Sequence, residues 1–384
     1  MPDFIENTIQ FIRDYYKSND VIPLHEPRFI GNEKEYVTNT IDSTFVSSVG
    51  AYVDQFEDMM AQISQTQRAV AVVNGTAALQ VSLRLAGVSR GDEVLTQALT
   101  FVATANAIAY NGAEPVFLDV DRDTMGLSPQ AVEAFLEEFG ELRDGDCYNK
   151  KTGNRISACV PMHTFGFPVH MNELMTVCET WNIPIVEDAA ESIGSTYHGK
   201  QSGGFGKFGV FSFNGNKIVT AGGGGAIVTN DAEAGDYAKH LTTTAKKPHK
   251  YEYVHDKLGY NYRMPNLNAA LICAQLEQLN NFIENKRTLA SKYESFFKKQ
   301  GLSFRTENPN TKANYWLMGA ELENRKERNQ FLKITNEQGI VTRPIWRLTY
   351  KLPMYEGCYR DEQKNAEYLE DRIVNIPSSV RVEE

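Results

Sequence analysis

The sequence has few cysteines, no long apolar run and no surplus of basic residues. Its five cysteines are scattered over 384 residues, and no two stand in a Cys-x-x-Cys spacing. This argues against a disulfide framework and indicates reduced thiols in the cytosol. No stretch approaches the roughly 18 apolar residues of a membrane span, and the N-terminus lacks the apolar segment of a signal peptide. We therefore predict a cytoplasmic protein with no membrane partner.

Basic charge is also scarce. The 49 acidic residues outnumber the 39 lysines and arginines, which gives a formal net charge of −10. A protein that binds duplex nucleic acid usually carries a basic surplus, so we expect no nucleic-acid partner. The charge does not exclude a phosphate-bearing small molecule, because a site can concentrate donors locally.

Between about Gln67 and Asp231, short β-branched runs alternate with helical periods. We expect strands at 68–75, 92–98, 114–120, 155–163 and 183–189, and helices at 76–87, 100–112, 128–139 and 170–182. Two further apolar runs follow at 208–214 and 224–231. Ser128 is the expected N-cap of the third helix. This alternation predicts an α/β domain whose mostly parallel sheet is covered by helices. Ligands of such sheets bind at the carboxyl ends of the strands.

Past Pro248 the pattern becomes mainly helical. Residues 266–301 carry helical periodicity that fits one long helix or two, and 324–338 is a charged helix-like run. A chain of this length suggests two domains. We expect a large domain over residues 1–250 and a smaller α+β domain over residues 251–384.

Three motifs follow expected strands. The first is "NGTAAL" at 74–79, where a strand ends and a helix begins. Gly75 permits a sharp turn, and the free N–H groups of Thr76 and Ala77 would point at an anion, as in other helix N-termini that bind phosphate. An ordinary strand-to-helix turn explains the motif equally well when it is taken alone.

The second motif is "IPIVEDAAES", in which an apolar strand delivers Glu187 and Asp188 at its carboxyl end. Asp188 could pair with a protonated ring nitrogen, and Glu191 could reach an adjacent polar group. The alternative is an acidic helix start, since Asp is favoured at N-caps.

The third motif, 211–225, places Lys217 a tight turn after a strand and four glycines, Gly222 to Gly225, soon after it. A lysine in a walled pocket can lose its proton and attack a carbonyl. Ser212 is placed to donate to a phosphate, and the glycines permit positive φ and the close approach of a ligand or a second chain. A Walker loop has its glycines before the lysine, and the dinucleotide-binding fingerprint fits neither register nor position. A solvated lysine on a loop is the remaining alternative.

The combination of the three motifs favours one cofactor. Pyridoxal 5′-phosphate (PLP) needs an anchor for its phosphate, a carboxylate for its pyridine nitrogen and an amine for its aldehyde. The sequence offers these in order on one α/β sheet.

The chain resembles fold-type-I PLP enzymes, and more closely the DegT/StrS family of nucleotide-sugar aminotransferases. The resemblance runs from "IPLHEPRFIGNEKEYV" to "NIPSSV" and is carried by "NGTAAL", "TFVATANAI", "PMHTFGFPVHM", "VEDAAES", "SFNGNK", "GGGGAIVTND", "GYNYRM" and "RPIW". Within the family, "HEPRFIGNE", "FVSSVG" and "NGNK" are similar to the enzymes that aminate C4 of UDP-4-keto-6-deoxy-N-acetylhexosamines in legionaminic-acid and bacillosamine pathways.

The resemblance implies a role for each matching residue. Thr76 and Ala77, which follow Gly75, would bind the PLP phosphate with help from Ser212. Phe101 would stack on the ring, Asp188 would pair with the pyridine nitrogen, and Glu191 would lie near the ring hydroxyl. Lys217 would hold the aldehyde covalently, and Asn261 would reach the phosphate of the cofactor in the other subunit. The last role implies a homodimer with shared active sites.

Two positions depart from the common family pattern. Many relatives have His where this chain has Asn214, and an acidic residue where it has Gly223. Some C4 aminotransferases that act on UDP sugars share these features.

Asn214 and four further residues are weaker candidates for substrate contacts. His163 ends a strand and either faces the site or is a structural histidine. Arg343 could bind a carboxylate or diphosphate, or lie on the surface. His25 and Arg28 could line the nucleotide entrance.

The resulting hypothesis is a ping-pong transamination from glutamate to a UDP-linked keto-sugar. The alternatives are an aminotransferase for a GDP- or dTDP-keto-sugar, a PLP-dependent sugar dehydratase, and a non-catalytic PLP-binding sensor. Lys217 argues against the dehydratase, in which a histidine takes the place of the lysine. A sensor would normally need an added DNA-binding module, which the sequence does not show.

Overall fold

Seven strands form the central sheet of the protein, for which a computed structural model describes residues 3–382. Their spatial order is β3 (Glu114–Leu118), β2 (Glu93–Gln97), β6 (Ile156–Val160), β7 (Val186–Asp188), β10 (Phe208–Ser212), β11 (Gly225–Thr229) and β1 (Arg68–Val72). Parallel bridges from Cys159 to Ile185 and from Met162 to Asp188 join β6 to β7. Only β11 runs against the others, since it pairs antiparallel with both β1 and β10. The predicted mostly parallel sheet is confirmed.

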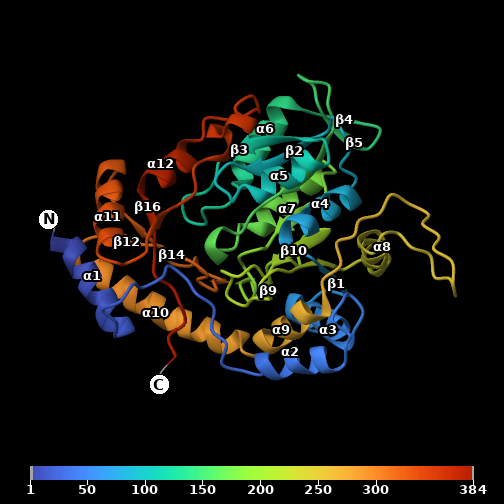
Figure 1. The fold of residues 1–384 in the computed structure, drawn as a ribbon. Coiled ribbons are helices and arrows are strands. Elements are labelled where there is room, and N and C mark those ends of the chain that lie inside the picture. The colour runs from blue at the N-terminus through green and yellow to red at the C-terminus, as the bar shows by residue number, and fades with distance from the viewer. Residues whose placement is uncertain (1–2, 383–384) are drawn as a thin grey trace.

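Both faces of this sheet are buried, as β1 illustrates. Val70 and Val72 belong to a core that includes residues of α4 (Gly75–Ala86), α5 (Ala103–Tyr110) and α8 (Ala232–Thr242), whereas Ala69 and Ala71 belong to the core on the other side. α3 (Ala51–Ser64) packs on that second face of β1. Farther along the sheet, α6 (Pro129–Phe139) and α7 (Met171–Thr180) supply a third core with β2, β3 and β6. Figure 1 shows these helices around the strands.

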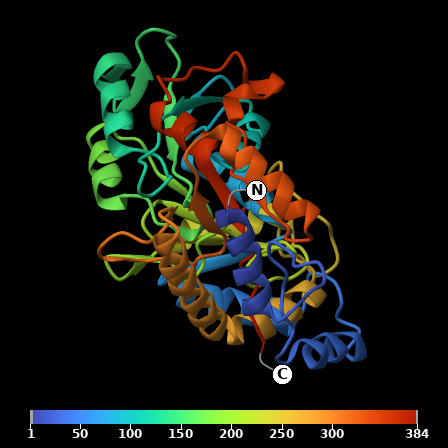
Figure 2. The same ribbon diagram turned by 90° about the vertical axis from the view of Figure 1, so that its left-hand side faces the viewer.

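A second, smaller sheet has the order β12 (Ser303–Phe304), β14 (Met318–Glu321), β16 (Ile373–Ile376) and β15 (Arg343–Pro344). It lies with α10 (Leu279–Lys299), α11 (Arg325–Glu337) and α12 (Lys364–Arg372). The N-terminal helix α1 (Asp3–Tyr16) lies beside these late elements (Figure 2). Phe4 stacks on Phe331 of α11, and Phe11 stacks on Phe296 of α10. The division into residues 1–250 and 251–384 stays a prediction.

The helical run at 266–301 consists of two helices. α9 (Asn266–Glu277) is followed by its C-cap residue Gln278, where ψ is −2°, and α10 starts at the residue after that. α9 packs against α2 (Glu33–Asp42) and α3, whereas α10 extends along the second sheet. A single straight helix could not have reached both partners.

Most helix ends lie within one or two residues of the predicted positions, but the helix expected over 100–112 spans only Ala103–Tyr110, and one cap needs correction. Ser128 occupies the N-cap position of α6, but its side chain makes no capping bond; its hydroxyl donates to Gln130 Oε1 instead. Gly87, at the end of α4, has φ +105°, as expected of a glycine C-cap. Within residues 3–382, no helix combines the length and the apolar character that crossing a membrane requires.

Gly209 in the middle of β10 allows a close approach that the sheet needs. A Cβ at this position would lie 1.9 Å from the carbonyl oxygen of Gly203. The neighbour is backbone, so it cannot move aside as a flexible side chain would.

We expect Gly209→Ala to destabilise the protein by about 1–3 kcal/mol or more, as overpacking of a core does. Thermal unfolding followed by circular dichroism measures the change. Gly357→Ala is the matched control, because a Cβ there meets nothing within 4 Å. Equal melting temperatures for the two variants would contradict this account of β10.

Candidate active site

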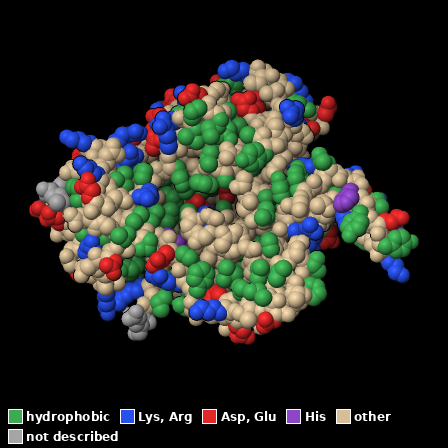
Figure 3. Space-filling model, in the orientation of Figure 1, with side chains coloured by type: hydrophobic (Ala, Val, Ile, Leu, Met, Phe, Trp, Pro, Cys, Tyr) green, Lys and Arg blue, Asp and Glu red, His purple; other side chains and the backbone are tan. Residues whose placement is uncertain are grey.

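One cavity of about 640 Å³ collects most of the predicted site residues. It lies where β1, β7 and β10 end, as expected for an open α/β sheet. Figure 3, drawn in the orientation of Figure 1, shows a hollow near the middle of the face that is turned toward the viewer. The predicted residues that line the cavity are Gly75, Thr76, Phe101, Asp188, Glu191, Ser212, Asn214, Lys217 and Arg343.

The N-terminus of α4 forms one wall of the cavity. Gly75 is required there, because a Cβ would lie 2.9 Å from the Cβ of Ser212. The hydroxyl-bearing residues Thr76 and Ser212 therefore meet at the start of a 12-residue helix, where backbone N–H groups favour an anion. The amide of Ala77, predicted to be free, is not: Asn74 Oδ1 accepts its N–H at 2.8 Å. The prediction missed that Asn74 caps this helix.

Asp188 lies at the end of β7, almost fully buried. Its Oδ2 accepts a hydrogen bond from the Thr104 hydroxyl at 2.7 Å, and its Oδ1 accepts one from the Ala190 N–H at 3.2 Å. Burial raises the pKa of Asp188, and the hydrogen bond from Thr104 opposes that shift. Both bonds fix the carboxylate in one orientation toward the cavity.

Glu187, one residue earlier, points away from the cavity, since side chains alternate along a strand. Its carboxylate accepts the N–H groups of Gly203, Phe205 and Gly206 at 2.6–2.8 Å. It also lies 3.0 Å from His163 Nε2. Glu187 therefore organises the loop that precedes β10.

Of the two alternatives left open for His163, the structure favours a structural histidine over a contact with sugar or cofactor. The ring is fully buried and does not line the cavity. Its Nδ1 accepts the N–H of Val169 at 3.1 Å, so the proton must sit on Nε2, which donates to Glu187. Neither nitrogen is left for a ligand.

Lys217 enters the cavity from a turn that follows β10. The turn is closed by a hydrogen bond from the Lys217 N–H to the Asn214 carbonyl at 3.0 Å. Its Nζ lies 3.5 Å from Glu191 Oε1 and 3.8 Å from the ring centre of Trp316. Burial lowers the pKa of Lys217, and the carboxylate of Glu191 opposes that shift. Burial also raises the pKa of Glu191, whose Oε2 is held by the Phe165 N–H at 2.9 Å.

The four glycines after Lys217 act differently from one another. Only Gly222 has a positive φ, of +73°. Gly225 permits a close approach within the chain itself, because a Cβ there would lie 2.6 Å from the backbone carbon of Asn74. Gly223 has open space around its Cβ position.

The opposite wall comes from the second sheet, through residues 343–347, which include Arg343, Trp346 and Arg347. Arg343 is exposed, and its Nη1 donates to Asn336 Oδ1 at 3.1 Å. Glu370 anchors the segment just after this wall by accepting the Leu348 N–H at 3.0 Å.

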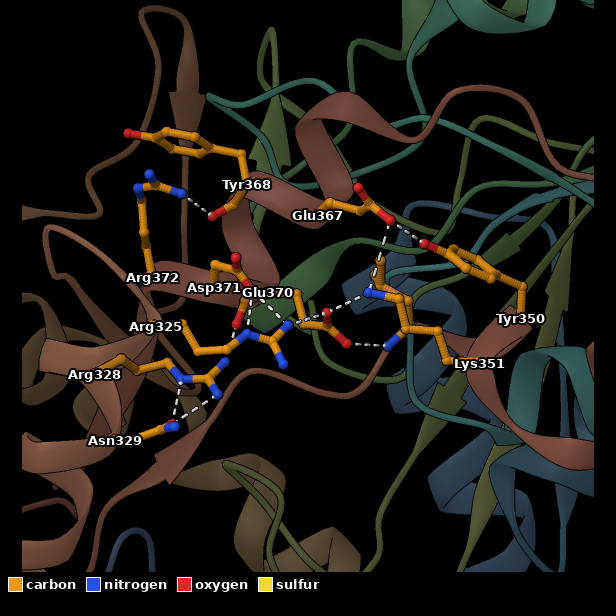
Figure 4. Close-up of polar contacts among 11 residues, drawn as sticks. Arg325, Arg328, Asn329, Tyr350, Lys351, Glu367, Tyr368, Glu370, Asp371 and Arg372 are labelled. Carbon is orange, nitrogen blue, oxygen red and sulfur yellow. Dashed lines mark hydrogen bonds and ion pairs between the residues drawn. The ribbon is translucent and has the colours of Figure 1, made fainter.

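Glu370 is itself fixed by two cations, as Figure 4 shows. Lys351 Nζ lies 2.6 Å from its Oε2, and Arg325 Nη2 lies 2.9 Å from the same oxygen. Thr349 then ties the segment to the large sheet through two bonds to the Ala98 carbonyl, both 2.9 Å long.

The other weak candidates lie outside the cavity. Arg28 lines a separate hollow with Tyr16, Lys17 and Arg381, and its Nε donates to the Val380 carbonyl. His25 is absent from the lining of either cavity, and burial, with the nearby Lys286, lowers its pKa. The expectation that His25 and Arg28 line the nucleotide entrance stays a prediction, and the structure places neither residue in the Lys217 cavity. Asn261 is exposed and accepts hydrogen bonds from Arg263.

The polar and aromatic residues in or beside the site that were not predicted include Thr104, Asn216, Trp316 and Arg347. The segments "ANYW" and "RPIWR" carry two of them. An aromatic residue before an apolar strand was the available signal for Trp316, but it is equally typical of a core position.

The donor set matches the parts of PLP. The start of α4 with Thr76 and Ser212 suits a phosphate, the buried Asp188 carboxylate suits a protonated ring nitrogen, and the buried Lys217 amine suits an aldehyde. Phe101, with 54 % of its surface exposed at the cavity, leaves a ring face free for stacking.

The comparisons with known proteins agree with this site. Residues 27–384 match the model of the DegT/DnrJ/EryC1/StrS aminotransferase family. The chain is 36% identical over 368 residues to EpsN of Bacillus subtilis (strain 168), provisionally named a pyridoxal phosphate-dependent aminotransferase, covering 94% of this chain and 92% of EpsN.

It is also 36% identical over 357 residues to the GDP-perosamine synthase of Escherichia coli O157:H7, covering 93% of each chain. The crystal structure of the aminotransferase TlmJ from Streptoalloteichus hindustanus superposes with a TM-score of 0.85 at 24% identity and covers 95% of both chains, which shows the fold. The chain therefore belongs to the DegT/DnrJ/EryC1/StrS aminotransferase family and is a PLP-dependent sugar aminotransferase of fold type I.

Proposed function

We propose that the enzyme transfers an amino group from glutamate to C4 of a UDP-4-keto-6-deoxy-N-acetylhexosamine, with Lys217 as the covalent anchor of PLP. The observation that carries the chemistry is the meeting of the Lys217 amine, the Asp188 carboxylate and the start of α4 in one cavity. The UDP-linked acceptor rests on the likeness of "HEPRFIGNE", "FVSSVG" and "NGNK" to C4 aminotransferases of that class.

Lys217 has two tasks in this proposal. Its amine holds the cofactor between turnovers, and once released it takes the proton from the α-carbon of the donor amino acid. PLP, when bound, supplies an electron-withdrawing ring that stabilises negative charge on that carbon. A base must be neutral to accept a proton, and burial favours the neutral amine by lowering the pKa of Lys217.

In this proposal, Asp188 and the start of α4 fix the position and orientation of the cofactor in the cavity. The Thr104 hydroxyl and the Ala190 N–H keep the Asp188 carboxylate aimed at the position of a ring nitrogen. A carboxylate there keeps that nitrogen protonated. Thr76 and Ser212 would hold the phosphate, and Phe101 would cover one ring face.

We expect Lys217→Ala to lower kcat by about 10⁴-fold or more, because it removes both the anchor and the base. Borohydride treatment of the PLP-loaded wild-type protein should label the Lys217 peptide, whereas the variant should not be labelled there. Lys298→Ala, an exposed lysine on α10, is the matched control and should keep wild-type turnover. Near-normal turnover by Lys217→Ala would refute the assignment.

A GDP-linked keto-sugar is the second candidate acceptor. The relative from Escherichia coli O157:H7 is a GDP-perosamine synthase, and so is one from Vibrio cholerae that is 35% identical over 364 residues. These identities favour the same type of reaction, and an experiment must identify the nucleotide that the acceptor sugar carries.

A panel of UDP-, GDP- and dTDP-linked 4-keto-6-deoxy sugars distinguishes these acceptors. Glutamate should bleach the visible absorbance of the bound cofactor, and the correct keto-sugar should restore it. We expect kcat/KM for the UDP-N-acetylhexosamine derivative to exceed that for the GDP sugar by roughly tenfold or more, about 1.4 kcal/mol. A preference of similar size for the GDP sugar would replace our proposal with the second candidate.

We further propose that the active enzyme is a homodimer in which Asn261 of each chain serves the site of the other. Asn261 lies outside the cavity of its own chain. It follows a long excursion, over residues 246–258, that extends away from the body of the molecule beyond α8 (Figure 1). Tyr251, Tyr253 and Leu258 on this arm are 77–80% exposed, and a cluster of exposed large side chains of this kind often marks a protein–protein contact.

Mixing two inactive variants tests the shared site. In a hybrid dimer of Lys217→Ala and Asn261→Ala chains, one site has both wild-type residues and the other has neither. We expect refolded mixtures to regain up to about a quarter of wild-type activity, since random pairing makes half of the dimers hybrids with one intact site each. If Asn261 serves its own chain, mixing would restore nothing.

A further inference from the structure

The turn that carries Lys217 has little packing of its own. Asn214 and Asn216 are exposed, and a Cβ at Gly215 would meet nothing within 4 Å. The turn must nevertheless hold an amine in a fixed position, because covalent capture of an aldehyde depends on orientation. A contact from another part of the fold is therefore needed.

Trp316 provides that contact, from a position about 100 residues later in the chain. Its Nε1–H donates to the Asn216 carbonyl at 2.7 Å, one residue before Lys217. Its ring centre lies 3.8 Å from Lys217 Nζ, within the range of a cation–π contact. One indole thus holds both the backbone of the turn and the amine at the end of the side chain.

The indole is itself rigidly placed. Trp316 has only 5% of its surface exposed, its backbone N–H donates to Asn314 Oδ1 at 2.9 Å, and its backbone carbonyl accepts the Ser378 hydroxyl at 2.9 Å. A residue held at both backbone groups can act as a fixed reference for a flexible turn.

Asn314 connects Trp316 to the acidic side of the cavity. Its Nδ2 donates to the carbonyls of Glu191 and Ile193 at 2.8 and 2.9 Å. The Glu191 carboxylate in turn lies 3.5 Å from Lys217 Nζ. The amine is thus held between a carboxylate and an indole that share one buried amide as their support. Gly166 leaves room for that amide, since a Cβ there would lie 1.8 Å from Asn314 Oδ1.

We propose that Trp316 is a positioning residue for Lys217: its N–H fixes the lysine's turn and its ring face holds the amine beside Glu191 whenever the amine is not bound to the cofactor. This inference rests on the role proposed above for Lys217. It gives the free amine a defined resting place from which it can reach the aldehyde and the reacting carbon. Trp316 touches neither group in this account and acts through Lys217.

Capture of PLP by the cofactor-free protein tests the proposal. In that step the Lys217 nitrogen bonds to the aldehyde carbon of PLP and one water is lost, and the rate is followed by absorbance and by borohydride labelling of the Lys217 peptide. Pyridoxine 5′-phosphate, which lacks the aldehyde, measures non-covalent binding in the same cavity. The two ligands separate the position of the amine from the shape of the pocket.

We expect Trp316→Leu to slow capture on the order of tenfold, since misplacement of a reacting group by a fraction of an ångström has effects of this size. Its Kd for pyridoxine 5′-phosphate should stay within about twofold of wild type. Trp316→Phe keeps a ring face but loses the indole N–H donor, so its rate of PLP capture should lie between those of the wild type and of Trp316→Leu. Trp181→Leu, the matched control at the end of α7, should capture PLP at the wild-type rate.

Three results would overturn the inference: capture by Trp316→Leu at the wild-type rate, an equal loss of capture and of pyridoxine 5′-phosphate binding, or an equal effect of Trp181→Leu. Should Trp316→Leu fail to fold, as its melting curve would show, Trp316→Phe alone decides, and unchanged capture by that variant counts against the role of the N–H. Capture at a lysine other than Lys217 in the wild-type protein would instead overturn the proposed function.

Discussion

The parallel pairing of β7 with β10 is the constraint on which the site depends. Register places Val210 beside Asp188, so the carboxyl ends of the two strands lie at the same edge of the sheet. The chain can then deliver a carboxylate from one strand and, after a short turn, an amine from the next. β11 returns antiparallel beside β10 and brings Gly225 against the Asn74–Gly75 turn, which closes the third side of the same cavity.

The site keeps several ionisable groups away from water, which is costly unless each has a partner. Asp188 has Thr104 and a backbone N–H, Glu191 has the Phe165 N–H and Lys217, and Lys217 has Glu191 and the Trp316 ring. Burial shifts the pKa of the two acids up and that of the lysine down, so each charge is less favoured than in water. Such shifts are common where side chains must exchange protons.

The second sheet and the segments next to it help to fix the geometry of the cavity. Two of its segments reach into the cavity, and each is anchored by a buried polar side chain: Asn314 supports Trp316, and Glu370 supports the wall at residues 343–347. Contacts across the two sheets therefore define the distance between the lysine turn and the wall at residues 343–347. The geometry of the site is a property of the whole fold, although its reactive groups lie on the large sheet.

The order of strands and helices between Gln67 and Asp231, the start of a helix within "NGTAAL", and the positions of Asp188 and Lys217 after strand ends could be predicted from the sequence. Each of these depends on residues that are close together in the chain: hydrophobic period, turn glycines and caps act locally. That a helix start, a carboxylate and an amine would meet at one edge of the sheet followed from the rule that parallel strands end at one edge.

Only the tertiary structure decided which polar groups are used up by the protein itself. His163 and Glu187 satisfy each other and the loop before β10, Asn74 occupies the Ala77 amide, and Arg28 turns toward Val380. Trp316 joins Lys217 from about 100 residues away, and no local pattern reports a contact of that separation. Sequence alone determined the kinds of chemical groups at the strand ends, whereas packing between distant segments determined which of those groups remain free to react, because hydrogen-bond partners are chosen in space and not along the chain.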